Sequence, residues 1–254
     1  MRWICLFVMV YGLHVNQEAS GQAASATVNV DEPTDFLGPY RAKATEKWEA
    51  EIQKLEALDT SQEDPADAIL FIGSSSIRRW DGIAVDMAPY RPIQRGFGGS
   101  KFSDVAVFAE RLMHPHHYRA LVMFVGNDVS GKPEDHTPEE VERLVRYIVG
   151  VSHQHQPDAP VLLIEVTPCE KRFAVWPQIR DVNVRLREIA LSTANTWFVA
   201  TAGDYLDPTG HPRSELFVED RLHLNADGYD LWSSLIRRRL DDVLRMAEAF
   251  RARQ

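Results

Sequence analysis

The chain has 254 residues, of which 44% are hydrophobic and 26% charged, so it is long enough for one full hydrophobic core or two small ones. It carries 37 acidic residues against 28 lysines and arginines, which gives a formal net charge of −9. An acidic chain of this kind is a poor candidate for binding nucleic acid or anionic membrane surfaces, because both repel negative charge.

The N-terminus has the pattern of a secretory signal over residues 1–26. Arg2 precedes the apolar run WICLFVMVYGL, which is too short for a stable membrane anchor, and small residues follow as far as Ala26. We expect cleavage after Ala26 and a secreted or periplasmic protein; an uncleaved anchor or a misassigned start codon is the alternative. Cleavage would leave Cys169 as the only cysteine, which excludes an intrachain disulfide.

Residues 27–66 are expected to form a lead-in and an amphipathic helix, because Trp48, Ile52 and Leu55 recur at helical spacing with charges between them. Short apolar runs then follow at residues 68–72, 92–96, 121–125, 161–166 and 196–200. Segments with helical spacing separate the runs at residues 103–113, 138–153 and 178–194, and a last helix is expected over residues 226–249 with Asn225 at its N-cap.

Apolar strands that alternate with helices predict a parallel sheet covered by helices on both faces. No internal repeat or long linker divides the chain, so residues 67–250 are expected to form one α/β domain. Ligands bind such sheets beyond the carboxyl ends of the strands. The residues that follow each apolar run are therefore the candidates for a functional site.

Residue types suited to nucleophilic catalysis stand at these places. The stretch GSSS follows the first run, GFGG the second and Asn127 the third, while Asp220 and His223 precede the last helix. A serine nucleophile needs a base to take its proton, the base needs a partner that fixes its tautomer, and the oxyanion needs N–H donors. Taken singly, each signal has a common structural explanation as a helix cap, a turn or a surface pair. Their order and placement together indicate a catalytic site.

Four sequence blocks in this order resemble the SGNH hydrolases, also called GDSL esterases and lipases. The blocks are FIGSSSIRRW, RGFGGSKFSD, FVGNDVSGK and DRLHLNADGY, and the resemblance covers residues 68–239. The stretches GSSSIRRW, RGFGGS and LHLNADGYDLW also resemble a bacterial subgroup described as similar to platelet-activating-factor acetylhydrolase. The resemblance implies a flavodoxin-like, three-layer α/β/α fold with a five-stranded parallel sheet, and it implies no metal or organic cofactor.

The same resemblance implies a role for five residues. Ser75 occupies the nucleophile position, His223 that of the base, and Asp220 that of the residue that orients the base. The oxyanion hole would consist of the backbone N–H groups of Ser75 and Gly99 and the side chain of Asn127.

Two departures from the family pattern bear on these roles. Position 74 is a serine where the family has an aspartate, which makes Ser74 and Ser76 rival nucleophiles. In the third block no residue separates Gly126 from Asn127, and a one-residue shortening could move the amide by ~3.3 Å. Whether Asn127 reaches the oxyanion therefore stays open.

Two further groups of residues have a functional and a structural interpretation. The histidines of HPHHY (His114, His116 and His117) are expected to form a solvated turn rather than a metal site, because no cysteine or glutamate is paired with them. Arg172 and Trp176 follow the fourth apolar run and could bind substrate, although Trp176 could equally pack under a helix.

The predicted function is a secreted serine esterase that hydrolyses short-acyl or acetyl carboxylic esters through an acyl-enzyme. A non-catalytic carbohydrate- or lipid-binding module on the same fold, and an acyltransferase with the same triad, are the alternatives. The expected partner is a small-molecule or polysaccharide ester, with no nucleic acid and no stable membrane anchor.

Overall fold

A parallel sheet of five strands forms the centre of the computed structural model, which describes residues 36–252. The strands are β1 (Ile69–Gly73), β2 (Pro92–Gly96), β3 (Ala120–Phe124), β4 (Val161–Ile164) and β5 (Thr196–Val199), in the order β2-β1-β3-β4-β5. All four neighbouring pairs are parallel. The predicted fold class is confirmed, and each strand lies within two residues of the apolar run that predicted it.

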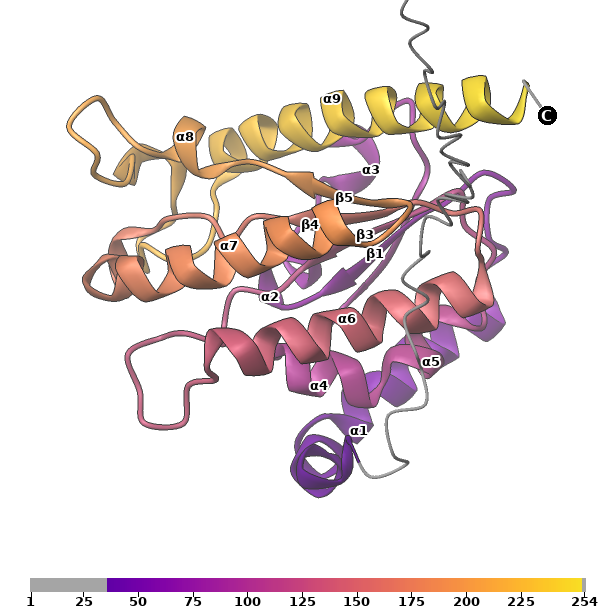
Figure 1. Cartoon of the computed structure of the whole chain (residues 1–254), viewed down its shortest axis with the longest axis horizontal. Helices are drawn as coiled ribbons and strands as arrows, with labels where there is room; N and C mark the ends of the chain where they lie inside the picture. The colour runs from indigo at the N-terminus through magenta and orange to yellow at the C-terminus, as the bar shows by residue number, and fades with distance from the viewer. Residues whose placement is uncertain (1–35, 253–254) are drawn as a thin grey trace, which may run out of the picture.

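Helices cover both faces of the sheet (Figure 1). One face packs on α1 (Gly38–Ser61), α4 (Phe102–Val107), α5 (Ala109–Met113), α6 (Pro138–His155) and α7 (Trp176–Ser192). The other face packs on α2 (Ser75–Arg78), α3 (Ile83–Asp86) and α9 (Ala226–Arg251). Leu70 and Ile72 of β1 enter the first core, while Ile69 and Phe71 enter the second. Because successive strand side chains point to opposite faces, a run that is apolar throughout requires cover on both sides.

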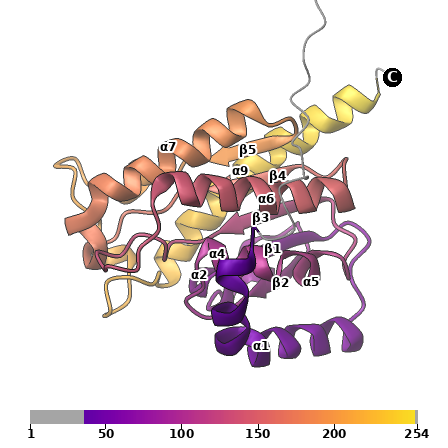
Figure 2. The ribbon, with the colours of Figure 1, turned by 60° about the horizontal axis from the view of Figure 1, so that its bottom comes forward.

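The α1 helix lies outermost on the first face, against α4 and α5 (Figure 2). Trp48 and Ile52 are buried, as their helical spacing predicted. Arg111 on α5 forms ion pairs with Glu49 and Glu56 at 2.8 and 2.7 Å, so the polar side of the helix is tied to the same neighbour. These contacts fix α1 beside the carboxyl edge of the sheet, where its first turns reach the candidate site.

The helices α6, α7 and α9 lie within two residues of the segments that predicted them, whereas α1 begins earlier than expected, at Gly38. The predicted helix over residues 103–113 is interrupted at Phe108, whose backbone leaves the helical region while its buried ring packs against Phe97. The predicted N-cap is confirmed, since the Asn225 side chain accepts the N–H of Gly228 at 2.9 Å. Short helical segments η1 (Glu170–Val175), α8 (Ala202–Tyr205) and η2 (Ser214–Leu216) lie in the remaining connections.

Two expectations concern the N-terminal segment and the membrane. The predicted signal segment, residues 1–26, lies outside the described residues. Within residues 36–252, none of the helices combines the length and the apolar character that crossing a bilayer demands.

The HPHHY turn at the amino end of β3 differs from the prediction. His114 and His117 are exposed, but His116 is buried, so the expectation of a fully solvated turn was wrong for this residue. Its Nδ1 lies 2.7 Å from the carboxylate of Asp64, and its Nε2 lies 3.3 Å from that of Asp59. The end of α1 and the loop after it fold over this turn and supply both carboxylates. Among the described residues, no group of three or more histidines, cysteines or carboxylates is arranged to hold a metal ion.

Candidate active site

Ser75 is the first residue of α2 and stands directly beyond the carboxyl end of β1. The sharp turn depends on Gly73, whose φ is +138° and whose Cβ, if it had one, would lie 1.9 Å from the carbonyl oxygen of Phe124. Only glycine tolerates this conformation and this approach of two backbones. The rival Ser74 lines the same pocket as Ser75 but is buried, with 1% exposure, whereas Ser75 is half-buried.

Ser75, His223 and Asp220 form a continuous hydrogen-bonded series. The Oγ of Ser75 lies 3.0 Å from Nε2 of His223, and Nδ1 of His223 lies 2.6 Å from Oδ2 of Asp220. The two outer residues are separated by more than 140 positions in the chain and come from opposite ends of the matched blocks. Sequence order could predict this meeting only through the shared carboxyl edge of the sheet. The other rival, Ser76, also lines the pocket, but the described residues show no hydrogen bond between it and His223.

The loop before α9 positions the carboxylate of Asp220. Arg221 adopts a left-handed backbone conformation with φ of 58°, which folds the loop back on itself. The Oδ1 atom of Asp220 then accepts the backbone N–H groups of Leu222 and His223, both at 2.9 Å. Burial by itself would raise the pKa of Asp220, but these hydrogen bonds and the one from the His223 ring outweigh it and lower the pKa to about 2. The group is therefore ionised whenever the imidazole needs a negative partner.

Three N–H donors come from the residues that follow β1, β2 and β3. Within the described part of the chain, the backbone N–H groups of Ser75 and Gly99 have no hydrogen-bond acceptor. The amide nitrogen of Asn127 lies 3.8 Å from the point where a Cβ on Gly99 would stand. Although the third block is shortened by one residue, the structure thus places Asn127 beside Gly99. Open donors in this arrangement match what a developing oxyanion requires.

Arg172 holds the amide of Asn127 in one orientation. Its guanidinium donates to the carbonyl oxygen of Gly126 and, at 2.5 Å, to Oδ1 of Asn127. The Nδ2 atom of Asn127 therefore points the other way, where it donates to the carbonyl of Ser100 at 3.1 Å and keeps a second N–H free. Arg172 was predicted to bind substrate, and the structure adds a positioning role that spacing alone could not indicate. Burial lowers the pKa of Arg172.

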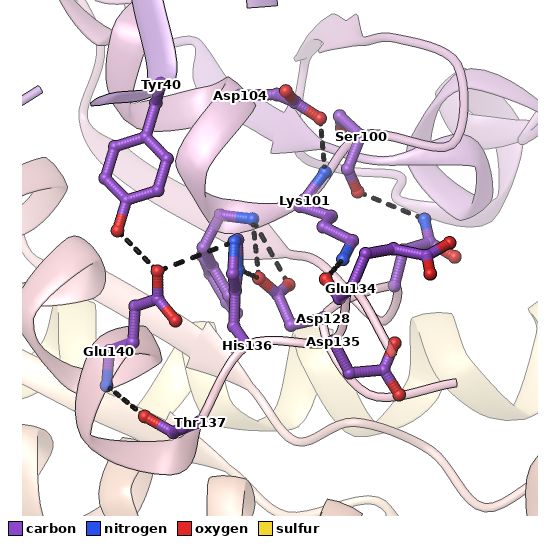
Figure 3. A network of polar contacts seen from close by, with 12 residues as sticks. Tyr40, Ser100, Lys101, Asp104, Asp128, Glu134, Asp135, His136, Thr137 and Glu140 are labelled. Carbon is purple, nitrogen blue, oxygen red and sulfur yellow. Dashed lines mark hydrogen bonds and ion pairs between the residues drawn. The ribbon is translucent and has the colours of Figure 1, made fainter. Parts of the chain in front are cut away.

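Asp128 is a structural residue that the sequence did not single out (Figure 3). It is buried and accepts the backbone N–H of Phe102 at 3.1 Å and Nδ1 of His136 at 2.8 Å. Burial raises its pKa, while the bond from His136 lowers it less strongly. The side chain thus joins the start of α4 to the loop before α6, directly behind Asn127.

Two other residues of the connection after β4, Trp176 and Cys169, are poorly suited to a direct role in catalysis. Trp176 packs against the first core and lines neither of the two cavities described below, so the alternative of packing under a helix holds for it. Cys169 is buried, and burial raises the pKa of its thiol, which disfavours the thiolate a cysteine nucleophile needs.

Two cavities of different character meet at Asn127. A narrow pocket of about 30 Å³ lies at Ser75 and His223 and has mostly apolar walls, including Phe124, Val166 and Leu224. One water molecule needs roughly 10–15 Å³ on this measure, so the pocket has room for only a few atoms. A wide groove of about 600 Å³ extends away from it. Asn127, Arg172 and Leu222 border both.

The chain matches the model of the GDSL-like lipase/acylhydrolase family over residues 70–231. The chain therefore belongs to this family, and the predicted resemblance is confirmed. Membership supports the hydrolysis of esters as its activity. Comparison with curated proteins gives no match.

Solved structures share the fold at low sequence identity. A protein from Streptococcus pneumoniae named for platelet activating factor is 20% identical, with a TM-score of 0.65 over 82% of this chain and 96% of the other. A GDSL-like lipase from Bacteroides thetaiotaomicron is 16% identical, with a TM-score of 0.64 over 76% and 98%. A carbohydrate esterase of family 3 from Talaromyces cellulolyticus is 14% identical, with a TM-score of 0.53 over 70% and 98%.

Proposed function

We propose that the protein hydrolyses carboxylic esters through an acyl-enzyme on Ser75. The observation that carries this proposal is the series of contacts from Ser75 Oγ through the ring of His223 to Asp220, at 3.0 and 2.6 Å. Neutral His223 takes the hydroxyl proton at Nε2 while Oγ attacks the carbonyl carbon. The N–H groups of Ser75, Gly99 and Asn127 stabilise the oxyanion. The protonated imidazole then gives its proton to the leaving alcohol, and Asp220 stabilises its charge.

Deacylation repeats these steps with water. His223 takes a proton from a water molecule, the hydroxide attacks the acyl carbon, and the proton returns to Ser75 Oγ as the acid leaves. Both half-reactions use the same base and the same oxyanion donors. No metal takes part in this scheme.

We propose a short acyl group, of acetyl size, for the substrate. The pocket at Ser75 offers about 30 Å³, and buried core residues such as Phe124, Phe217 and Trp232 line it. A long chain would have to displace packed side chains such as Phe124 and Trp232, which protein interiors resist.

The test is hydrolysis of p-nitrophenyl esters of increasing chain length, followed by labelling with a fluorophosphonate. We expect the rate to fall steeply from acetate to octanoate and the label to be found on Ser75. A label on Ser76, or a preference for octanoate, would refute the assigned nucleophile or the acyl size respectively. Transfer of the acyl group to a sugar acceptor faster than to water would instead indicate an acyltransferase.

We also propose that the chain is exported and cleaved after Ala26, on the pattern of its first 26 residues. N-terminal sequencing of the protein secreted by its expressing bacterium tests this. Recovery of an uncleaved chain from the cytoplasm would contradict it.

A further inference from the structure

The wide groove beside the site collects nearly all the lysines of the chain. The sequence contains six lysines, and five of them line this groove: Lys43, Lys47, Lys101, Lys132 and Lys171. The sixth, Lys54, lies exposed elsewhere on α1. The protein as a whole has a net charge of −9, so the groove differs from the rest of the molecule in the sign of its charge.

The lysines of the groove are not held in ion pairs. None of the five lysines forms an ion pair with any described residue. Lys101 donates to the carbonyl of Glu134, and Lys47 lies 4.5 Å above the ring of Trp48, so neither meets a carboxylate. The guanidinium of Arg172 also binds only neutral oxygens in this wall. Two carboxylates line the groove, those of Asp104 and Glu134, which leaves a formal excess of four positive charges with His136 neutral.

The walls that carry these charges are held in place. Tyr40 on α1 donates to Glu140 on α6, which lies 3.8 Å from His136, and His136 continues to Asp128 (Figure 3). This series joins α1, with Lys43 and Lys47, to the segment that carries Asn127. The loop with Lys132 is closed by Asp135, which accepts its N–H at 3.1 Å. The lysines therefore project from a fixed frame, and the binding of a ligand need not order the backbone first.

The groove continues from the catalytic centre. Gly99 and Asn127 border it, and both offer donors to the proposed oxyanion. If the narrow pocket holds the acyl group, the alcohol part of the ester extends into the groove. Most of the side chains that line the groove are charged or polar, alongside Pro39, Tyr40 and Leu222.

We propose that the groove binds the alcohol part of the substrate and that this part is an acidic saccharide, bearing carboxylate or phosphate groups. This inference rests on the proposed esterase function. Lys43 and Lys47 lie on α1, which precedes the family match at residues 70–231, so the preference belongs to this chain's own N-terminal helix. Several cations around one groove attract an anion over a distance of about a Debye length, and salt weakens that attraction.

The test measures binding by calorimetry to the Ser75→Ala protein, so that no ligand is consumed. The ligands are an O-acetylated oligogalacturonate, an acetylated hexose phosphate and a neutral acetylated xylo-oligosaccharide. We expect an acidic ligand to bind about tenfold or more tightly than the neutral one at about 50 mM salt, and the difference to shrink at about 500 mM. The tighter of the two acidic ligands identifies the anion.

The matched variants place the effect in the groove. Adding Lys43→Gln and Lys47→Gln should weaken binding of the acidic ligand by about tenfold and leave the neutral ligand almost unchanged. Adding Lys54→Gln, on the same helix outside the groove, should change neither. Equal affinity for acidic and neutral ligands, or equal effects of Lys54→Gln and the double substitution, would overturn the proposal. So would binding to phosphatidylglycerol vesicles without any binding of acidic saccharides.

Hydrolysis of p-nitrophenyl acetate by the unmutated protein separates this inference from the proposed function. If the protein hydrolyses the ester but binds acidic and neutral ligands equally well, the acidic saccharide is rejected and the esterase function is retained. Charge-dependent binding without turnover of any ester rejects the esterase and retains the groove as an anion site.

Discussion

Two histidine–carboxylate pairs lie at opposite ends of the same sheet, and their local geometry is almost identical. At the carboxyl edge, Nδ1 of His223 lies 2.6 Å from Asp220; at the amino edge, Nδ1 of His116 lies 2.7 Å from Asp64. What differs is the second ring nitrogen. That of His223 faces the hydroxyl of Ser75 in a pocket, whereas that of His116 faces a second carboxylate, Asp59, with 1% of the side chain exposed.

The comparison shows that a paired histidine is not in itself a catalytic group. The pair of His116 joins the end of α1 to the turn before β3, and His116 lines none of the cavities described for residues 36–252. Asp59 also pairs with buried Arg95 at 2.7 Å, so its carboxylate is part of a closed network. The proposed site at His223, by contrast, lacks one reacting group, the carbonyl group that a substrate would supply. Substitutions at the two ends should therefore separate activity from stability.

The largest effect is expected from Ser75→Ala. Loss of the nucleophile should lower kcat by about 10⁴-fold or more, because the oxyanion donors alone support little turnover. The hydroxyl makes no contact that the fold needs, so the melting temperature should stay near that of the unmutated protein. Rates on p-nitrophenyl acetate and thermal unfolding check both. Retention of a tenth of the activity would show that another serine, such as Ser76, attacks.

Asp220→Asn should be nearly as severe. An amide in place of the carboxylate removes the charge that stabilises protonated His223 and disturbs its tautomer, so we expect kcat to fall by about 10³–10⁴-fold. Asp64→Asn makes the same chemical change at the other pair and should leave kcat almost unaltered. Steady-state kinetics on both variants compare the two ends directly. Equal losses would show that the variants act through folding rather than through the base.

The fold and the meeting of Ser75, His223 and Asp220 at one edge of the sheet were the features that the sequence predicted best. Apolar runs such as residues 68–72 are buried on both faces of the sheet. Burial on both faces requires an apolar side chain at each position, and the sequence shows such runs directly. The triad followed because its residues stand at the ends of elements, where topology brings them together. The burial of His116 was not predicted, because it depends on the path of α1 and of the loop after it. The sequence around His116 does not indicate that path. The hydrogen bond from Arg172 to Asn127 was not predicted for a similar reason, since the two residues lie 45 positions apart in the chain.

Asn127→Ala should lower kcat by about 10²–10³-fold with little change in KM, the scale that the loss of one oxyanion donor produces. The neighbouring Asp128→Asn is the control. Asp128 bonds to Phe102 and His136 but faces away from Ser75, so its substitution should lower the melting temperature and affect kcat less. A normal kcat for Asn127→Ala would leave the oxyanion to the backbone N–H groups of Ser75 and Gly99.

Acid should reduce activity, because only the neutral imidazole of His223 can accept the serine proton. Asp220 does not contribute to this loss, since its pKa is about 2 in the folded protein. A lowered pKa stabilises the fold above the unfolded value near 4, and that stabilisation disappears only as the pH falls toward 2. A pH profile of kcat/KM, with circular dichroism at each pH, should show one ionisation and an intact fold above about pH 4. Unfolding in step with the loss of activity would contradict this assignment.

The smallest effect on activity is expected from His116→Gln. Glutamine preserves polarity but removes the ring that bonds to Asp64 at 2.7 Å and lies 3.3 Å from Asp59, and the site lies at the far end of the sheet from Ser75. We expect the free energy of unfolding to fall by about 1–3 kcal/mol, the usual cost of leaving a buried polar partner unsatisfied. For a chain of this size that corresponds to roughly 2–4 °C in melting temperature per kcal/mol. Because kcat should be unchanged in the folded protein, a loss of activity without a loss of stability would mean that the two pairs are coupled through the sheet.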